Sequence, residues 1–316
     1  MQTTPEELSE NYEVIVIGAG AAGASAAVAL SRSLRRVLVI DAGAPRNAVS
    51  AHAHNVLGQE GVNPLELLAR GRQEAIDYGA HWLEARAENL QGTRESGFSI
   101  QAAGRTFHGE RVLLATGLSD QLPDIPGITQ AWGVSALHCP YCHGYEVRGE
   151  QIVVLGTGEM SAHQALMFRQ LSEHVTYLEQ VPGQLTQDDE RRLAALSIEI
   201  RRDAVQRLDV DDRGQISMLH LASGATLPAK ALVLANRLEA NADLYVGLGG
   251  ALAEHPVGRF IEVDQMQQTA IPGVYAAGNT SNLMHMVMAA AASGTMAGAA
   301  INAELIMNRA VVASGR

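Results

Sequence analysis

Residues 13–41 read EVIVIGAGAAGASAAVALSRSLRRVLVID, and this stretch decides the fold of the chain. It consists of a short apolar strand, a turn that contains Gly18, Gly20 and Gly23, an alanine-rich helix and a second strand that ends in Asp41. Glycines at this spacing allow a tight turn and let a pyrophosphate approach the backbone, while the helix N-terminus stabilises its charge. Asp41 stands where the acid that binds a ribose hydroxyl is expected. The stretch therefore predicts a dinucleotide-binding domain.

The pattern occurs a second time in the middle of the chain. Residues 151–155 (QIVVL) form an apolar strand that runs into Gly156, Gly158 and Ser161, and a later strand ends in Glu179. Ser161 takes the place of the third glycine and is small enough for close packing. Two such turns in one chain predict two Rossmann-like domains.

Two distant segments share the character of the first domain. Residues 111–117 (RVLLATG) are a buried strand that ends in a glycine turn, and residues 273–279 (GVYAAGN) are another strand that ends beside a helix rich in small residues. The predicted fold class is therefore α/β, with two Rossmann-like three-layer domains, the second inserted into the first. We expect a discontinuous first domain over 1–120 and 250–316, and an inserted domain over 121–249 that carries the cysteines.

Composition excludes several classes of protein. The 316-residue chain has a net charge of −11, which argues against nucleic acid and against an anionic membrane as partners. The most apolar stretch, residues 286–301, is shorter than the roughly 20 residues that a transmembrane helix needs. Residues 1–13 are acidic and contain no apolar signal core. We therefore expect a cytoplasmic protein.

The only two cysteines, Cys139 and Cys142, lie in the segment HCPYCHGYE over residues 138–146. A single Cys-x-x-Cys is not the pattern of a disulfide-stapled secreted domain. Zinc would need four ligands, which His138, His143 and the cysteines between them cannot easily place tetrahedrally. We therefore predict no metal site and a redox-active pair. A helix that starts at the pair would lower the pKa of a cysteine.

His143 is the candidate general base next to the cysteines. The unperturbed pKa of histidine, about 6.5, suits proton transfer from a thiol at neutral pH. A histidine that only packs is the alternative for His143, and more so for His138 and His285.

Taken together, these motifs resemble the low-molecular-weight thioredoxin reductase family over nearly the whole chain. The elements that carry the resemblance are GAGAAG from Gly18, ATG from Ala115, the Cys-x-x-Cys before a second glycine turn, and IPGVYAAGN from Ile271. The resemblance implies a homodimer with FAD in the discontinuous domain. It also implies that substrate attacks Cys139, and that Cys142 is the sulfur that passes electrons to the flavin.

The residues implied to bind FAD come from four parts of the sequence. They are Gly18, Gly20, Ala21, Gly23, Asp41, Ala42, Arg46, Asn55, Ala115, Thr116, Gly117, Gly278, Asn279 and His285. The residues implied to act on thiols are Cys139, Cys142, His143 and His138.

Departures from the reductases narrow the prediction. The reductases hold the 2′-phosphate of NADPH with an arginine cluster after the strand that here ends in Glu179, but this chain reads Glu-Gln-Val-Pro-Gly there. A carboxylate repels a 2′-phosphate, so we expect poor NADPH use at the site of Gly156, Gly158 and Glu179, while NADH stays possible. The reductases also carry an acid after the second cysteine, where this chain has His143.

The strings CPYCHGYE and DAGAPRN resemble the dithiol oxidase branch, which closes disulfides of the gliotoxin and holomycin type in antibiotic biosynthesis. We therefore predict an FAD-dependent oxidase that forms an intramolecular disulfide in a small dithiol and passes electrons to O2, releasing H2O2. Two alternatives stay open. One is a disulfide reductase that uses NADH or a protein electron donor, and the other is a non-catalytic redox sensor that keeps FAD.

Overall fold

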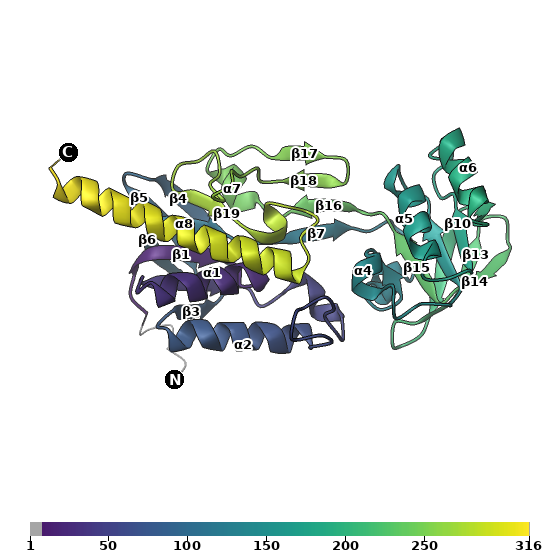
Figure 1. The fold of residues 1–316 in the computed structure, drawn as a ribbon, viewed down its shortest axis with the longest axis horizontal. Coiled ribbons are helices and arrows are strands. Elements are labelled where there is room, and N and C mark those ends of the chain that lie inside the picture. The colour runs from purple at the N-terminus through teal and green to yellow at the C-terminus, as the bar shows by residue number, and fades with distance from the viewer. Residues whose placement is uncertain (1–7, 316) are drawn as a thin grey trace. The chain divides into compact units, whose positions relative to one another are not determined.

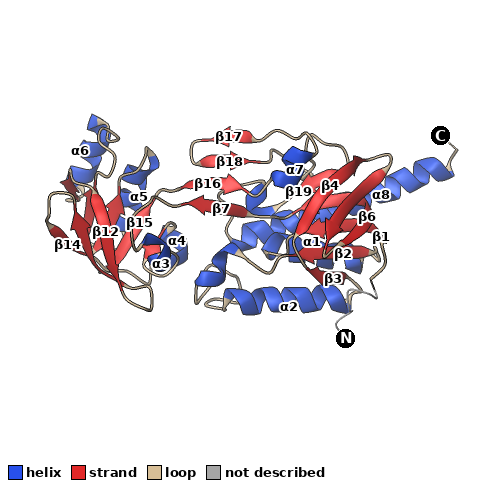
Figure 2. Cartoon of the chain, turned by 180° about the vertical axis from the view of Figure 1, so that it is seen from behind, coloured by secondary structure: helices blue, strands red, loops and turns tan. Residues whose placement is uncertain are grey.

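The computed structural model describes residues 8–315 and divides the chain into two compact units. The first unit combines the chain up to Ala48 with Val56–Ser119 and with the chain from Leu238 onward. The second unit consists of Asp120–Arg237 together with the short segment Val49–Asn55. Figures 1 and 2 show the elements of each unit.

The first unit is built on a seven-stranded sheet with the order β3-β2-β1-β6-β5-β4. β6 is long enough to serve two neighbours on one edge, because β5 pairs antiparallel with its first half and β19 pairs parallel with its last three residues. The strands are β1 (Asn11–Ile17), β2 (Val37–Asp41), β3 (His81–Glu84), β4 (Ala87–Thr93), β5 (Gly97–Ala102), β6 (Arg105–Leu114) and β19 (Val274–Ala276). β1, β2, β3, β6 and β19 run parallel, so their carboxyl ends meet at one edge.

Three helices accompany this sheet, α1 (Ala21–Arg32), α2 (Pro64–Asp77) and α8 (Val287–Ala313). α1 and α8 lie side by side (Figure 1), and their contact is very close because both are rich in small residues. A side chain at Gly294 of α8 would come within 1.9 Å of the backbone oxygen of Ala22 on α1. Valines of β1 and β2 and alanines of both helices form the apolar core on this face.

A second apolar cluster covers the other face of the sheet. It includes Tyr245 from α7 (Asp243–Gly247), which packs on β4. A smaller four-stranded sheet follows the order β17-β18-β16-β7. Its strands are β7 (Leu118–Gln121), β16 (Arg237–Ala240), β17 (Ala253–His255) and β18 (Gly258–Phe260). β7 and β16 span the points where the chain passes between the units, at 119–120 and at 237–238.

The second unit contains a parallel sheet with the order β11-β10-β9-β15-β8 and an antiparallel sheet of β12, β13 and β14. The parallel strands are β8 (Ala136–Leu137), β9 (Ile152–Leu155), β10 (Val175–Leu178), β11 (Glu199–Arg201) and β15 (Ala231–Leu234). The antiparallel strands are β12 (Val205–Val210), β13 (Ile216–Leu221) and β14 (Thr226–Pro228). The helices are α3 (Ile128–Ala131), α4 (Pro140–His143), α5 (Met160–Arg169) and α6 (Gln187–Ala195). Two apolar clusters pack on β9, β10 and β15.

These sheets confirm the predicted α/β class, with a Rossmann-like unit inserted into another. The division of the chain differs from the expected ranges at three places, the smallest of which is the single residue Asp120, which belongs to the second unit. Residues 238–249 belong to the first unit, because Tyr245 and its neighbours in α7 complete the apolar cluster on the main sheet. Segment 49–55 belongs to the second unit. Residues 1–7, over which the absence of a signal core was predicted, lie outside the described part of the chain.

Candidate functional site

The first glycine turn lies between β1 and α1, at the carboxyl edge of the main sheet. Gly18 has a φ of +87°, and a side chain there would come within 2.5 Å of the Ala115 backbone oxygen. A side chain on Gly23 would come within 1.9 Å of the Gly18 oxygen. By contrast, a Cβ at Gly20 would meet nothing within 4 Å. Gly18 and Gly23 therefore close the turn, whereas Gly20 leaves open space at the start of α1.

That open space has the chemistry of an anion site. No side chain caps the N-terminus of α1, so its first amides point to the space without a side-chain acceptor. Asp41, at the end of β2, accepts a hydrogen bond from the Ala19 amide through Oδ1 at 3.0 Å. This bond fixes the carboxylate beside the glycine turn, where it can accept a hydrogen bond from a ribose hydroxyl. The arrangement fits the diphosphate and ribose of a dinucleotide.

Other predicted FAD residues lie around the same edge. The Ala115 amide donates to the Ile17 oxygen, which ties the end of β6 to the end of β1. Thr116 donates from Oγ1 to the Asn241 oxygen at 2.6 Å. Gly117 has a φ of +69°, and a Cβ there would meet nothing within 4 Å. Two more predicted residues follow β2, with Ala42 exposed and Arg46 at the start of the short 3-10 helix Arg46–Val49.

The segment that follows β19 completes this edge. The Gly278 amide donates to Ser293 Oγ of α8 at 2.9 Å, and a Cβ at Gly278 would lie 2.8 Å from that of Ala22. Asn279 donates from Nδ2 to the backbone oxygen of His285 at 2.9 Å. The Nδ1 atom of His285 is buried and has no hydrogen-bond partner, and burial lowers its pKa. A buried, unsatisfied nitrogen at this edge fits a position that faces a polar cofactor.

Cys142 lies in α4, a single helical turn, and Cys139 is the residue immediately before it. The Sγ atoms of Cys139 and Cys142 are 2.7 Å apart in a dithiol arrangement, and both side chains are partly exposed. A disulfide needs only a small movement from this spacing. Since α4 has only one turn, its dipole is small, and the expected effect of a helix on the cysteines is correspondingly weak. A Cβ on Gly144 would come within 2.3 Å of the Pro140 backbone oxygen, so glycine is needed directly after α4.

His143 is the last residue of α4 and is partly buried. Burial lowers the pKa of His143, the carboxylate of Glu146 raises it, and His54 lowers it, with a net decrease. The imidazole is therefore neutral at neutral pH and can accept a proton. His138 lies before the pair, with Nδ1 3.0 Å from the Leu234 oxygen. That contact ties the ring to the end of β15. One ring nitrogen of His138 is therefore used in packing, although the residue directly precedes Cys139 in the sequence.

The second glycine turn lies between β9 and α5, and its polar groups bind one another. Ser161 Oγ accepts hydrogen bonds from the amides of Thr157 and Gly158, at 3.1 and 3.3 Å. These are amides that would hold a pyrophosphate in an occupied Rossmann turn. Glu179 Oε1 accepts from the Gly183 amide at 3.0 Å, and its other oxygen is 3.5 Å from Arg202.

Tyr177 further changes this turn. A Cβ on Gly156 would lie 2.4 Å from the Tyr177 hydroxyl, so the glycine makes room for the phenol. That hydroxyl is buried without a hydrogen-bond partner. Burial, with the charges of Glu179 and Asp189, raises the pKa of Tyr177 to about 12. The phenol is thus neutral and packs against the first glycine of the turn, whereas a Cβ at the second glycine, Gly158, would meet nothing within 4 Å.

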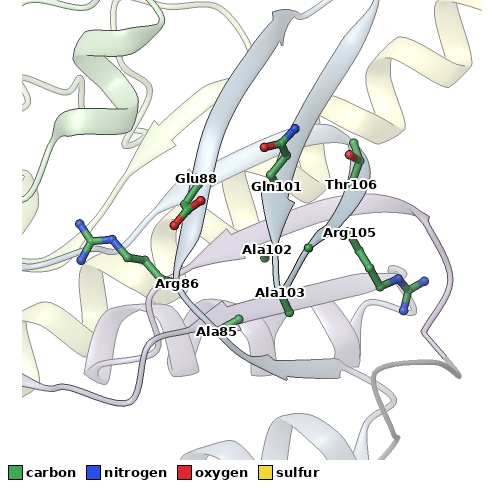
Figure 3. Close-up of a pocket in the computed structure, with 9 residues that line it drawn as sticks. Ala85, Arg86, Glu88, Gln101, Ala102, Ala103, Arg105 and Thr106 are labelled. Carbon is green, nitrogen blue, oxygen red and sulfur yellow. The ribbon is translucent and has the colours of Figure 1, made fainter.

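A separate hollow of about 410 Å³ lies at the turn between β5 and β6. It is lined by Ala85, Arg86, Glu88, Gln101, Ala102, Ala103, Gly104, Arg105 and Thr106. Figure 3 shows that Arg86 and Arg105 point away from each other on opposite sides of it. None of the predicted cofactor or thiol residues lines this hollow, and its mixed charges define no particular ligand. Among residues 8–315, no cluster of three or more His, Cys, Asp or Glu side chains could hold a metal ion.

Several residues at the two sites were not predicted from the sequence. Asn241 and Ser293 accept hydrogen bonds from Thr116 and Gly278, two of the residues predicted to bind FAD. The charges of His54 and Glu146 act on His143. Asn241, Ser293 and His54 make contacts with residues far away in the sequence, and none of the four belongs to a recognisable motif. The sequence around them therefore gave no local signal of a role. The Ser161 hydroxyl had such a signal, because a serine at the third position of a glycine turn can bond the amides before it.

Comparison with known proteins defines the family. Residues 12–294 match the model of the pyridine nucleotide-disulphide oxidoreductase family, and the chain belongs to that family. It is 30% identical to thioredoxin reductase sirT of Leptosphaeria maculans, over 92% of this chain and 93% of the relative. It is also 30% identical to thioredoxin reductase tcpT of Claviceps purpurea, over 94% and 95% of the two chains.

Solved structures give the same result. The crystal structure of HlmI is 35% identical, with a TM-score of 0.89 over 98% of this chain and 99% of that one. An oxidoreductase from Agrobacterium tumefaciens is 32% identical, with a TM-score of 0.88 over 94% and 99% of the two chains. The resemblance to thioredoxin reductase-like flavoproteins is confirmed, and the protein is an oxidoreductase whose cofactor is FAD. Among the described helices, none combines the length and apolarity that crossing a bilayer requires.

Proposed function

We propose that this protein is an FAD-dependent dithiol oxidase that forms an intramolecular disulfide in a small natural-product dithiol. The observation that carries the proposal is the contrast between the two glycine turns. Gly20 and Gly158 both leave open space, and both turns precede a helix without a side-chain cap. At the second turn, however, the amides of Thr157 and Gly158 are bonded to Ser161 of the turn itself. An enzyme that takes its electrons from a thiol substrate does not need a nicotinamide nucleotide at the second turn.

The thiol chemistry is assigned to residues of α4. A substrate thiolate attacks the oxidised pair at Cys139 Sγ, a mixed disulfide forms, and Cys142 leaves as thiolate. The second substrate thiol then attacks the mixed disulfide, which releases the cyclic substrate disulfide and leaves the enzyme with two reduced cysteines. His143, neutral because its pKa is lowered, accepts the proton of the attacking thiol.

FAD, when bound, accepts two electrons from the reduced pair and can pass them to O2, which yields H2O2. Gly18, Gly20 and Gly23 with Asp41 would hold its diphosphate and ribose, and His285 with Asn279 would line its other end. We propose further that the protein acts in the cytoplasm as a homodimer. Exposed methionines at 286, 288, 296 and 307, in or next to α8, support self-association.

Stopped-flow flavin spectroscopy without oxygen tests the proposal. A small dithiol such as dithiothreitol should bleach the flavin absorbance, and air should restore it with one H2O2 formed per flavin. NADH and NADPH should leave the absorbance unchanged on the same timescale. Rapid bleaching by either nucleotide would instead establish a reductase. No bleaching by any donor would favour the non-catalytic redox sensor.

A further inference from the structure

A short segment of distant sequence contacts the redox helix in the second unit. Segment 49–55 belongs to this unit although the residues before and after it belong to the first. Its first residue, Val49, lies against Gly133, where a Cβ would come within 2.3 Å of the valine side chain. Its last residue, Asn55, has a left-handed φ of +59° and donates from Nδ2 to the Tyr141 oxygen at 2.7 Å. The segment is therefore fixed at both ends.

Between these ends, His54 contacts the turn that follows α4. Its Nε2 atom lies 3.3 Å from Oε1 of Glu146. The side chain of His54 is 21% exposed and that of Glu146 is 40% exposed, so His54 is the better fixed of the two. An exposed glutamate in a turn adopts many rotamers, and a contact with a fixed imidazole selects among them.

Glu146 matters because it lies three residues after His143, in the turn that follows α4. Its carboxylate is the charge that stabilises the protonated His143 ring. When His143 accepts a thiol proton, the imidazolium forms beside that carboxylate. The charged and titratable groups that act on His143 within the described residues are Glu146 and His54, and His52 packs near His54 with ring centroids 6.3 Å apart.

From this geometry we infer that His54 is a positioning residue for the thiol chemistry, acting by holding Glu146 toward His143. The inference rests on the proposed role of His143 and adds to it a pair of residues that the thiol mechanism above does not use. The reaction concerned is exchange alone: a dithiol reduces the Cys139–Cys142 disulfide, one S–S bond breaks, another forms, and the proton passes to His143. The enzyme disulfide is the oxidant, so the step balances without oxygen.

The experiment is a double-mutant cycle on purified, FAD-loaded enzyme. The second-order rate of exchange between oxidised enzyme and dithiothreitol is followed without oxygen by rapid acid quench and alkylation of the new thiols. His54→Ala should slow exchange about two- to fivefold, the range of a partly exposed ion pair. His54→Gln, whose amide can still donate to Glu146, should restore most of the rate. His163→Ala, which removes an exposed histidine of α5, is the matched control and should leave the rate unchanged.

The cycle is completed in the Glu146→Gln background. If His54 acts through Glu146, His54→Ala should have little further effect there. An equal loss in both backgrounds, or no loss in either, would overturn the inference. FAD content and melting temperature of each variant show whether the fold is kept, and the Gln variant provides the answer where the Ala variant is unstable. Because only exchange is measured, a failure of the oxidase proposal would appear separately, as absence of H2O2.

Discussion

Gly20 and Gly23 stand three residues apart in the same turn, and we expect their substitution by alanine to separate cofactor binding from folding. A Cβ at residue 23 would lie 1.9 Å from the Gly18 oxygen, a backbone atom that cannot rotate away. Ordinary carbon–oxygen contacts are about 3.3–3.6 Å, so the start of α1 must move by more than 1 Å. Overpacking of this kind costs about 1–3 kcal/mol. Gly23→Ala should therefore lower the melting temperature of the apoprotein by several degrees.

Gly20→Ala should have the opposite profile. Residue 20 has a φ of −62°, which alanine adopts freely, and its Cβ would meet no protein atom within 4 Å. Alanine is a poorer N-cap residue than glycine, which destabilises the folded protein, but it also restricts the unfolded chain, which stabilises it. Because these two effects nearly cancel, the free energy of unfolding should change by less than about 1 kcal/mol. The methyl group would, however, enter the space needed for close approach of a pyrophosphate. FAD affinity should fall about tenfold or more, since the methyl group and the pyrophosphate cannot occupy the same space.

Two measurements on apoprotein decide between these profiles. Thermal unfolding followed by circular dichroism reports stability, and quenching of flavin fluorescence on titration reports FAD affinity. The reasoning would be refuted if Gly23→Ala melted with the wild type. It would also be refuted if Gly20→Ala bound FAD as tightly as the wild type.

Three further predictions concern the redox pair, its base and the core. Cys142→Ser should abolish flavin bleaching by dithiothreitol while FAD content stays at the wild-type level, and retained bleaching would show that thiols reach the flavin directly. His143→Ala should slow exchange about 100-fold; in the wild type the rate should rise with pH through the lowered pKa of His143, so its acid limb should lie below that of free imidazole, and the variant should lack this limb. Glu304→Gln should destabilise the protein by about 2–4 kcal/mol in urea unfolding at pH 7, because Arg111 would lose a buried partner. Burial raises the pKa of Glu304, but hydrogen bonds from Arg111 and Tyr275 and the nearby arginine charges lower it overall. The stability that Glu304 contributes is therefore present above about pH 4.5 and is lost as the pH falls through the lowered pKa. The variant should accordingly lose less stability in acid than the wild type.

The sequence by itself determined the family, the cofactor and the two-turn architecture. Strand, glycine turn, helix and acid follow one another within residues 13–41, and the chemistry of a dinucleotide turn depends on that local order. The Cys-x-x-Cys is equally local, since residues three apart face each other on one helical turn. Such motifs can be recognised without knowledge of what packs around them.

Only the tertiary structure decided how these motifs are used. The Tyr177 hydroxyl fills the space at Gly156, and Gly294 lets α8 approach the backbone of Ala22, through contacts between separate elements. The pairing of His54 with Glu146 joins residues from distant parts of the chain. The division of the chain at Leu238 likewise depends on α7 completing the core of the first unit. Such contacts are set by which faces of the folded elements meet, and a sequence pattern describes each face alone but not its partner.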